Sequence, residues 1–414
     1  MRFRLVNWEP TLNLNLSTPM KTYTLTTPKP AQINRFPALL KKLDPLPRGA
    51  HEALPVVSLG ADLEKAGACL AAQVEGGTVL ALATLTREEC LDLTRELMAR
   101  GTRVVVVLEA CGFGWEWQRA LRGAGATVFT VAPEALTGRR KTNRRDAAAL
   151  ARLGTERVLQ GNAQSGRVVR EPSRAEQEPR AVARQRQKLI SLRGRLEGMG
   201  RGLLLDFGIV EYPDGWWGKK MWPRLKAMLE ARDESFLLEQ LTGLQALAQS
   251  LHSHIRALDL QLADIAKRVT TTALPAGLGE ATATLINLEV CDWQRFRNRK
   301  QSGSFTGCCP SESSTGTGQK LGSIDRMGNR RIRSALTEAI WRMKRHEPGW
   351  QGFTKWGPVL FDPQASSVRK KKAVMACVRL LFIDLWRLNT GRVTLAELGC
   401  KGRPADYREI EDAA

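Results

Sequence analysis

Histidine and paired cysteine are scarce in this chain of 414 residues, and their scarcity narrows the chemistry that the chain can perform. Only four histidines are present, so a zinc site built on imidazole ligands is not expected. The eight cysteines show no C-x-x-C pair, and the adjacent Cys308 and Cys309 are poorly placed to share a metal ion. We therefore expect reduced thiols, which are typical of a cytoplasmic protein.

Long apolar runs are also missing. No stretch reaches the length of a membrane-spanning helix, and the first residues lack the apolar core of a signal peptide. We therefore expect neither a membrane partner nor secretion. Residues 1–50 are polar, rich in threonine and proline, and aperiodic, which predicts a disordered leader with Met20 as an alternative start.

Positive charge is what the chain has in excess. Lysine and arginine number 63 against 42 aspartates and glutamates, which gives a net charge of +21. A field of this sign attracts a polyanion, and it is informative about partners rather than about the fold. Nucleic acid is the expected partner. The basic run from Arg369 to Lys372 is equally well interpreted as a solvated surface or as a contact to a phosphate backbone.

Segments with the patterns of strands and helices alternate after Leu54 and predict an α/β domain. Strands are expected at 56–60, 66–74, 78–84, 104–108 and 127–131, and helices at 86–100 and 117–122. Two long amphipathic helices, 180–205 and 234–269, predict an antiparallel hairpin or a dimerising coiled coil. The turn 274–279 resembles a helix-hairpin-helix element, whose backbone amides can hold a phosphate.

Three acidic residues stand at the ends of predicted elements. Asp62 follows the first strand, Glu109 ends a later strand, and Asp146 opens a helix after a basic turn. Carboxylates at the ends of adjacent strands, with another on a nearby helix, can converge on Mg²⁺ and assist phosphoryl transfer. The sequence therefore predicts a magnesium site, although single acids at strand ends are commonly just solvated.

The segment 302–333 carries a run of hydroxyl side chains on a glycine-rich stretch that leads into a basic helix. The hydroxyls are Ser311, Ser313, Ser314 and Thr315, and the nearby cations are Lys320, Arg326, Arg330 and Arg331. A hydroxyl presented among cations suits attack on a phosphodiester, because the cations compensate the developing negative charge. The other interpretation is an ordinary surface loop that precedes a helix.

Four motifs in this order resemble the DEDD-type insertion-sequence transposases, the family of bridge-RNA-guided recombinases. They are Gly60–Lys65, Leu108–Gly112, Lys141–Ala147 and Pro310–Asn329, and the resemblance runs from about Leu54 to about Leu388. It implies an RNase H-like (resolvase-like) α/β domain, a helical linker and a mostly α C-terminal domain with a catalytic serine. It also implies Mg²⁺, donor and target DNA, a structured noncoding guide RNA, a homo-oligomer (dimer or tetramer) and a place at the bacterial nucleoid.

The resemblance also assigns roles to single residues. Asp62, Glu109 and Asp146 match three of its four acids, and Asn143 stands where the family has an aspartate. Asn143 can offer a carbonyl oxygen to a metal but carries no charge. Ser314 or Thr315 would be the nucleophile, and we favour Ser314 because a primary hydroxyl is less hindered. Nucleic-acid contacts are expected from Arg139, Arg140, Lys141, Arg144, Arg145, Lys320, Arg326, Arg330 and Arg331.

These observations divide the chain into five expected regions. They are a leader (1–50), an RNase H-like DEDD domain (51–160), a long-helix linker (161–270), a C-terminal transposase domain (271–395) and a tail (396–414). The leading functional hypothesis is RNA-guided cleavage and rejoining of DNA through a covalent phosphoserine intermediate, assisted by Mg²⁺. The alternatives are a junction-selective, metal-dependent nuclease, which needs only the N-terminal site, and a decayed nucleic-acid-binding protein.

Overall fold

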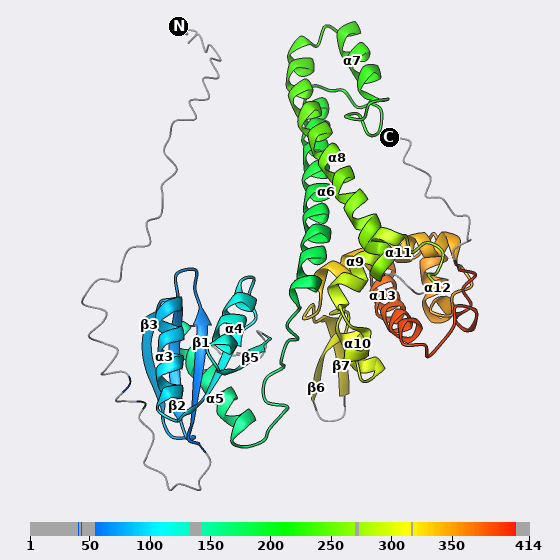
Figure 1. Cartoon of the computed structure of the whole chain (residues 1–414). Helices are drawn as coiled ribbons and strands as arrows, with labels where there is room; N and C mark the ends of the chain where they lie inside the picture. The colour runs from blue at the N-terminus through cyan, green and yellow to red at the C-terminus, as the bar shows by residue number, and fades with distance from the viewer. Residues whose placement is uncertain are drawn as a thin grey trace, which may run out of the picture. The chain divides into compact units, whose positions relative to one another are not determined.

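The chain forms two compact units, Met1–Glu171 and Pro172–Ala414 (Figure 1). The computed structural model describes Leu40, Leu43 and residues 54–132, 142–269, 273–315 and 318–402; of residues 313–321 it describes no side chains. The predicted leader lies outside the described residues except for Leu40 and Leu43, which are buried in the core of the N-terminal unit.

The N-terminal unit is built on a mixed sheet of five strands in the order β3-β2-β1-β4-β5 (Figure 1). The strands are β1 (Val56–Leu63), β2 (Ala68–Val74), β3 (Val79–Leu85), β4 (Arg103–Glu109) and β5 (Thr127–Val131). Neighbouring strands are antiparallel from β1 through β2 to β3 and parallel from β1 through β4 to β5. All five strands confirm the segments predicted from the sequence.

Helices cover both faces of this sheet. On one face, α3 (Arg87–Ala99) and α4 (Gly114–Gly123) share a core with Leu59 of β1 and with Val106 and Leu108 of β4. On the other face, α5 (Asn143–Val158) packs its Leu150 against Val105 of β4 and the neighbouring valines. Burial on both faces explains why β4 is an unbroken run of valines rather than an alternating pattern.

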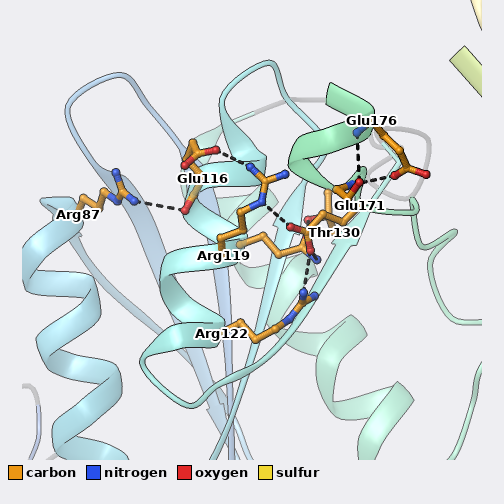
Figure 2. Close-up of polar contacts among 9 residues, drawn as sticks. Arg87, Glu116, Arg119, Arg122, Thr130, Glu171 and Glu176 are labelled. Carbon is orange, nitrogen blue, oxygen red and sulfur yellow. Dashed lines mark hydrogen bonds and ion pairs between the residues drawn. The ribbon is translucent and has the colours of Figure 1, made fainter. Parts of the chain in front are cut away.

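The segment after α5 returns to the sheet and completes the N-terminal unit. Val168 pairs with Val131 at the end of β5. The carboxylate of Glu171 accepts hydrogen bonds from Arg119 Nε (2.9 Å) and Arg122 Nη1 (2.7 Å), both on α4 (Figure 2). The N-terminal unit therefore extends to Glu171, beyond the boundary at residue 160 expected from the sequence.

The C-terminal unit begins with a long helical hairpin. Helices α6 (Arg174–Asp206) and α8 (Ser235–Val269) run antiparallel along each other, with α7 (Trp222–Ala231) at the tip (Figure 1). A small core at the tip surrounds Trp216, whose indole lies so close to Gly200 of α6 that a Cβ there would overlap the ring. The antiparallel hairpin is confirmed, whereas dimerisation through these helices stays a prediction.

The rest of the C-terminal unit is a helical body with one β-hairpin. Its helices are α9 (Glu280–Val290), α10 (Arg299–Ser304), α11 (Arg330–His346), α12 (Phe353–Phe361) and α13 (Ser367–Asn389), with short 3-10 helices η2 (Trp293–Arg295) and η3 (Ala396–Leu398). The hairpin consists of β6 (Pro310–Thr315) and β7 (Gly318–Ile324). The glycine-rich stretch expected to be a loop is therefore a pair of strands, because its hydroxyl residues satisfy their backbone groups by cross-strand pairing.

The predicted helix-hairpin-helix turn has a role inside the fold. Gly277 adopts a left-handed conformation (φ +89°), which a glycine tolerates best. The amide of Ala276 donates to Oε1 of the buried Glu347 (2.9 Å), and the same carboxylate accepts from the amides of Lys401 and Gly402. This turn follows the 35-residue α8 rather than a short helix. The anion that the amide of Ala276 binds is the carboxylate of Glu347 rather than a phosphate.

All eight cysteines are free, as predicted for reduced thiols. In the parts of the chain that the structure describes, no helix is both long and apolar enough to cross a membrane.

Candidate active site

Asp62 and Glu109 lie side by side at one end of the sheet. Ala61 of β1 pairs with Leu108 of β4 in a parallel register, so Asp62 and Glu109 are the next residues of the two strands. Residues in register on neighbouring strands share a face, and this face is the one that α5 covers. Both side chains are half-buried. Glu109 ends β4 as predicted, whereas Asp62, which was expected to follow the first strand, is the penultimate residue of β1.

Small residues bring the backbone of α5 against β1. A Cβ at Gly60 would overlap the carbonyl oxygen of Ala147, and Ser58 Oγ donates a hydrogen bond to the carbonyl of Ala151 (2.6 Å). As β1 proceeds from Ser58 to Asp62, its neighbours on α5 run backwards towards the first helical turn. The sequence neighbour of Ala147, Asp146, therefore belongs to the same end of β1 as Asp62.

A further carboxylate, Glu64, joins this end of the sheet from the turn between β1 and β2. Asn143 Nδ2 donates to Glu64 Oε1 at 2.5 Å. Burial raises the pKa of the Cys69 thiol, the charges of Asp62 and Glu64 raise it further, and Arg144 lowers it. These three charges therefore act at one place. Sequence reasoning missed Glu64, because no local pattern shows that it meets a residue 79 positions away.

The donor set of Asp62, Glu109 and Asp146 consists of the hard carboxylate oxygens that suit Mg²⁺. The register of Asp62 and Glu109 fits such an ion. Within the described ranges, however, no group of three or more His, Cys, Asp or Glu side chains lies close enough together to hold a metal. The three-acid magnesium site therefore stays a prediction.

The basic residues expected around α5 are only partly visible. Thr142 caps the helix by accepting from the amide of Arg145 (3.4 Å), and the positive end of the helix dipole favours an anion there. Arg144 and Arg145 are exposed on the first turn, where a phosphate backbone can reach them. The other three expected contacts, Arg139, Arg140 and Lys141, lie outside the described residues.

The second candidate group lies at the tip of the β6–β7 hairpin. Ser314 pairs with Gln319 and Thr315 pairs with Gly318, which are the last pairs before the turn. Consecutive positions of a strand lie on opposite faces of the ribbon, so Ser314 and Thr315 belong to different faces.

The basic helix that follows the hairpin begins where the sequence predicts. Asn329 caps α11 by accepting hydrogen bonds from the amides of Arg331 (3.0 Å) and Ile332 (3.2 Å). Gly328 lies so close to Gly307 that a Cβ would overlap its amide nitrogen, which explains the glycine before the cap. The expected cations Arg326 and Arg330 are exposed beside this cap. The side chain of Lys320 is not among those described.

A buried carboxylate holds the start of α11 in place. The side chain of Glu289 on α9 is 1% exposed and accepts from Arg184 of α6 (2.6 and 2.8 Å) and from Asn329 Nδ2 (2.8 Å). Burial by itself raises the pKa of Glu289, but the bonds from Arg184 and Asn329 and the charge of Arg331 lower it overall. An ionised acid thus anchors the cap of the basic helix, and sequence reasoning missed it because α9 resembles an ordinary packing helix.

Part of the C-terminal unit matches a known protein family. Residues 274–355, which include the serine hairpin and the start of α11, match the family model described as "Transposase IS116/IS110/IS902 family". The N-terminal acids lie outside that match.

Several curated relatives carry transposase names. The chain is 27% identical to a "Probable family 20 transposase" of Pseudomonas aeruginosa, over 61% of this chain and 73% of the relative. It is 25% identical to the transposase for insertion sequence element IS1111A of Coxiella burnetii (70% and 78%), and 25% identical to that for IS1328 of Yersinia enterocolitica (68% and 82%). The chain is thus an enzyme of the transposase class. Within that class, the match and the relatives support the IS116/IS110/IS902 family.

Proposed function

We propose that this transposase is an RNA-guided DNA recombinase that cuts and rejoins strands through a covalent bond to Ser314. The observation that carries the proposal is the position of Ser314 at the tip of the β6–β7 hairpin, within the family-model match and shortly before the basic start of α11. The net charge of +21 supports nucleic-acid partners. Guidance by a structured RNA rests on the four motifs that resemble the bridge-RNA-guided recombinases.

The proposed step is a transesterification at phosphorus. Ser314 Oγ forms a bond to the phosphorus of a DNA phosphodiester, the bond from that phosphorus to one strand-end oxygen breaks, and the serine proton ends on the leaving oxygen. Rejoining is the same exchange with the oxygen of another strand end as the attacking atom. Arg326 and Arg330 are the exposed cations that would compensate the negative charge building up on the phosphate.

The N-terminal unit would supply the second half of the chemistry. Asp62, Glu109 and Asp146 would hold Mg²⁺, which when bound neutralises charge on a phosphate. The mixed sheet with Asp62 and Glu109 in register at the ends of its parallel strands supports the RNase H-like assignment. A dimer or tetramer, in which one protomer's serine meets another's acids, would keep a lone protomer from cutting DNA.

The test is a search for a protein–DNA adduct. The purified protein is incubated with Mg²⁺, the structured RNA that flanks its gene and end-labelled DNA, and the products are separated by denaturing electrophoresis. We expect a labelled band that migrates with the protein, its loss in Ser314→Ala, and a milder effect of Thr315→Ala. If only Thr315→Ala removes the band, the nucleophile is Thr315. If neither variant changes it, the phosphoserine mechanism is wrong.

A junction-selective nuclease is the second candidate, because the register of Asp62 and Glu109 requires nothing from the serine hairpin. Its signature in the same experiment is free cleaved DNA ends without an adduct, lost in Asp62→Asn and retained in Ser314→Ala. Binding of DNA without cleavage would instead indicate a decayed protein, in which Asn143 has replaced a required aspartate.

A further inference from the structure

A cavity of about 540 Å³ opens in the C-terminal unit between the residues that start α10 and the last turns of α13. Four arginines line it, namely Arg297, Arg299, Arg387 and Arg392, and we call it the arginine cavity. Its volume lies in the range of pockets that hold small organic ligands, roughly 300–1,000 Å³. None of its residues belongs to the serine hairpin or to the acid group of the N-terminal unit.

The charge of the arginine cavity is strongly positive. Its one acid, Asp384, accepts hydrogen bonds from Trp350 Nε1 (3.1 Å) and Arg387 Nη1 (3.2 Å), so that this arginine and this acid neutralise each other. Among the described residues, no ion pair involves Arg297, Arg299 or Arg392. Three lining arginines are therefore left without an ion pair among the described residues, and of these the charge of Arg299 also acts on the carboxylate of Asp384.

The arginine cavity also has an apolar wall. Leu380, Ile383 and Trp386 line it from α13. The guanidinium of Arg392 lies over the ring of Trp386, 4.5 Å from its centroid, which holds that cation at the rim. The indole Nε1 of Trp386 is buried and has no hydrogen-bond partner among the described residues, so this N–H donor of the apolar wall is unsatisfied.

This combination of cations and apolar surface selects the ligand chemistry. Guanidinium groups bind phosphate oxygens through paired hydrogen bonds, and arginine is the residue of choice for phosphate recognition. A bare phosphate would leave the wall of Leu380 and Ile383 uncovered. A base within a duplex stays stacked and cannot reach such a wall, whereas an unpaired base can.

We propose that the arginine cavity binds an unpaired nucleotide of a nucleic-acid strand. The phosphate lies on Arg297, Arg299 and Arg392, and the base or sugar lies against Leu380 and Ile383. The site is separate from the serine hairpin, and its occupancy does not require phosphoserine chemistry. Such a site grips a single strand independently of the sequence of that strand.

The first experiment measures affinity by fluorescence anisotropy of a labelled oligothymidylate of about ten nucleotides, alone and annealed to its complement. The variant Arg297→Ala/Arg392→Ala is compared with wild type and with Arg256→Ala/Arg268→Ala, which removes the same two positive charges at exposed arginines of α8 outside the cavity. We expect each cavity arginine to contribute roughly tenfold to single-strand affinity, since a charge-assisted hydrogen bond contributes about that much. Duplex affinity should fall much less.

The outcomes separate the sources of the ligand. A double cavity variant that loses no more single-strand affinity than Arg256→Ala/Arg268→Ala would overturn the proposal, as would an equal loss for single strand and duplex. Mononucleotide that competes as well as the oligonucleotide would also overturn it, because the site would then be one for a free nucleotide. Since both altered arginines are exposed, the variants are expected to fold, and circular dichroism checks this.

A second measurement locates the strand directly. Phenylglyoxal modifies accessible arginines, and mass spectrometry then reads the modified positions. Bound oligothymidylate should protect Arg297, Arg299 and Arg392, whereas inorganic phosphate at the same concentration should not. Full modification of these three residues in the bound state would contradict the proposal. Because Ser314→Ala should show the same protection, failure of the adduct assay and failure of this inference are distinguishable.

Discussion

The carboxylates at the end of the sheet and those in the helical body have different partners. In the N-terminal unit, Asp62 and Glu109 stand in register at the end of the sheet, and Glu64 joins them from a turn. In the C-terminal unit, Glu289 and Asp384 are each held by an arginine and a further donor within the protein. The end of the sheet thus brings carboxylates together, whereas each of these two acids of the helical body is held by an arginine.

The difference follows from the secondary structure of each unit. The parallel strands β1 and β4 end at the same edge of the sheet, so acidic residues at their ends lie next to each other. Helices that pack against one another bury the side chains at their contacts, and a charged side chain buried there needs a partner of opposite charge. The end of the sheet therefore groups Asp62 with Glu109, whereas the helical body pairs Glu289 and Asp384 with arginines.

The largest expected effect concerns the buried acid of the C-terminal unit. Arg184→Met removes the bidentate partner of Glu289 and leaves a carboxylate that is 1% exposed. We expect a loss of about 3–5 kcal/mol in the free energy of unfolding at neutral pH. Urea denaturation followed by tryptophan fluorescence measures it. Arg268→Ala, at a pair whose side chains are both 70% exposed, is the control and should cost less than about 1 kcal/mol.

The same variant has a pH dependence whose sign is fixed by the pKa of Glu289. In wild type this pKa is lowered, so the pair stabilises the fold above the pKa of the unfolded chain, and the stabilisation is lost as pH falls through the folded pKa. Without Arg184, burial raises the pKa and favours the protonated acid. The deficit of Arg184→Met should therefore shrink on acidification. A deficit that grows towards low pH would show that Glu289 is not the group responsible.

The next effect tests how the N-terminal unit assembles its acids. Gly60→Ala places a methyl group against the carbonyl oxygen of Ala147 and must push α5 away from β1. We expect a loss of about 1–3 kcal/mol in stability, together with weaker Mg²⁺ dependence of DNA cleavage. Gly123→Ala is the matched control, because a Cβ there meets nothing within 4 Å and the position is helical. That variant should be neutral or slightly more stable.

Much of the comparison between the units could be predicted from the sequence. The β1–β5 strands, the antiparallel α6–α8 hairpin and the start of α11 at Arg330 follow from local patterns of apolar residues and from the Gly328–Asn329 signal. The strand-end positions of Asp62 and Glu109 follow as well, because the end of a strand is a local property.

What the sequence did not predict depends on contacts between distant residues. The bond from Asn143 to Glu64 spans 79 positions, and that from Arg184 to Glu289 spans 105. No periodicity reports such pairs. The β6–β7 hairpin was expected to be a loop, because its serines, threonines and glycines have weak strand propensity and are held by cross-strand pairing instead.

A smaller effect is expected at Asn143, where a substitution can add a further carboxylate to the N-terminal unit. Asn143→Asp replaces a hydrogen-bond donor with a second carboxylate beside Glu64. Like charges at this distance repel, so without divalent ions the melting temperature should fall by a few degrees, corresponding to about 1 kcal/mol. Mg²⁺ should restore it, since an added carboxylate is a hard ligand. A variant that melts equally with and without Mg²⁺ would place Asn143 outside any metal site.

The smallest expected effect is at the network that closes the N-terminal unit. Arg122 is 54% exposed and binds Glu171, which also keeps Arg119 Nε at 2.9 Å and Gln118 Nε2 at 3.0 Å. Because two donors remain and the lost pair is solvated, Arg122→Ala should cost less than about 1 kcal/mol, and the cost should vanish in high salt. Arg119→Ala removes a 23% exposed partner and should cost more. An equal, salt-independent cost for both variants would mean that Glu171 is held as rigidly as Glu289, and the contrast between exposed and buried acids would not hold at this boundary.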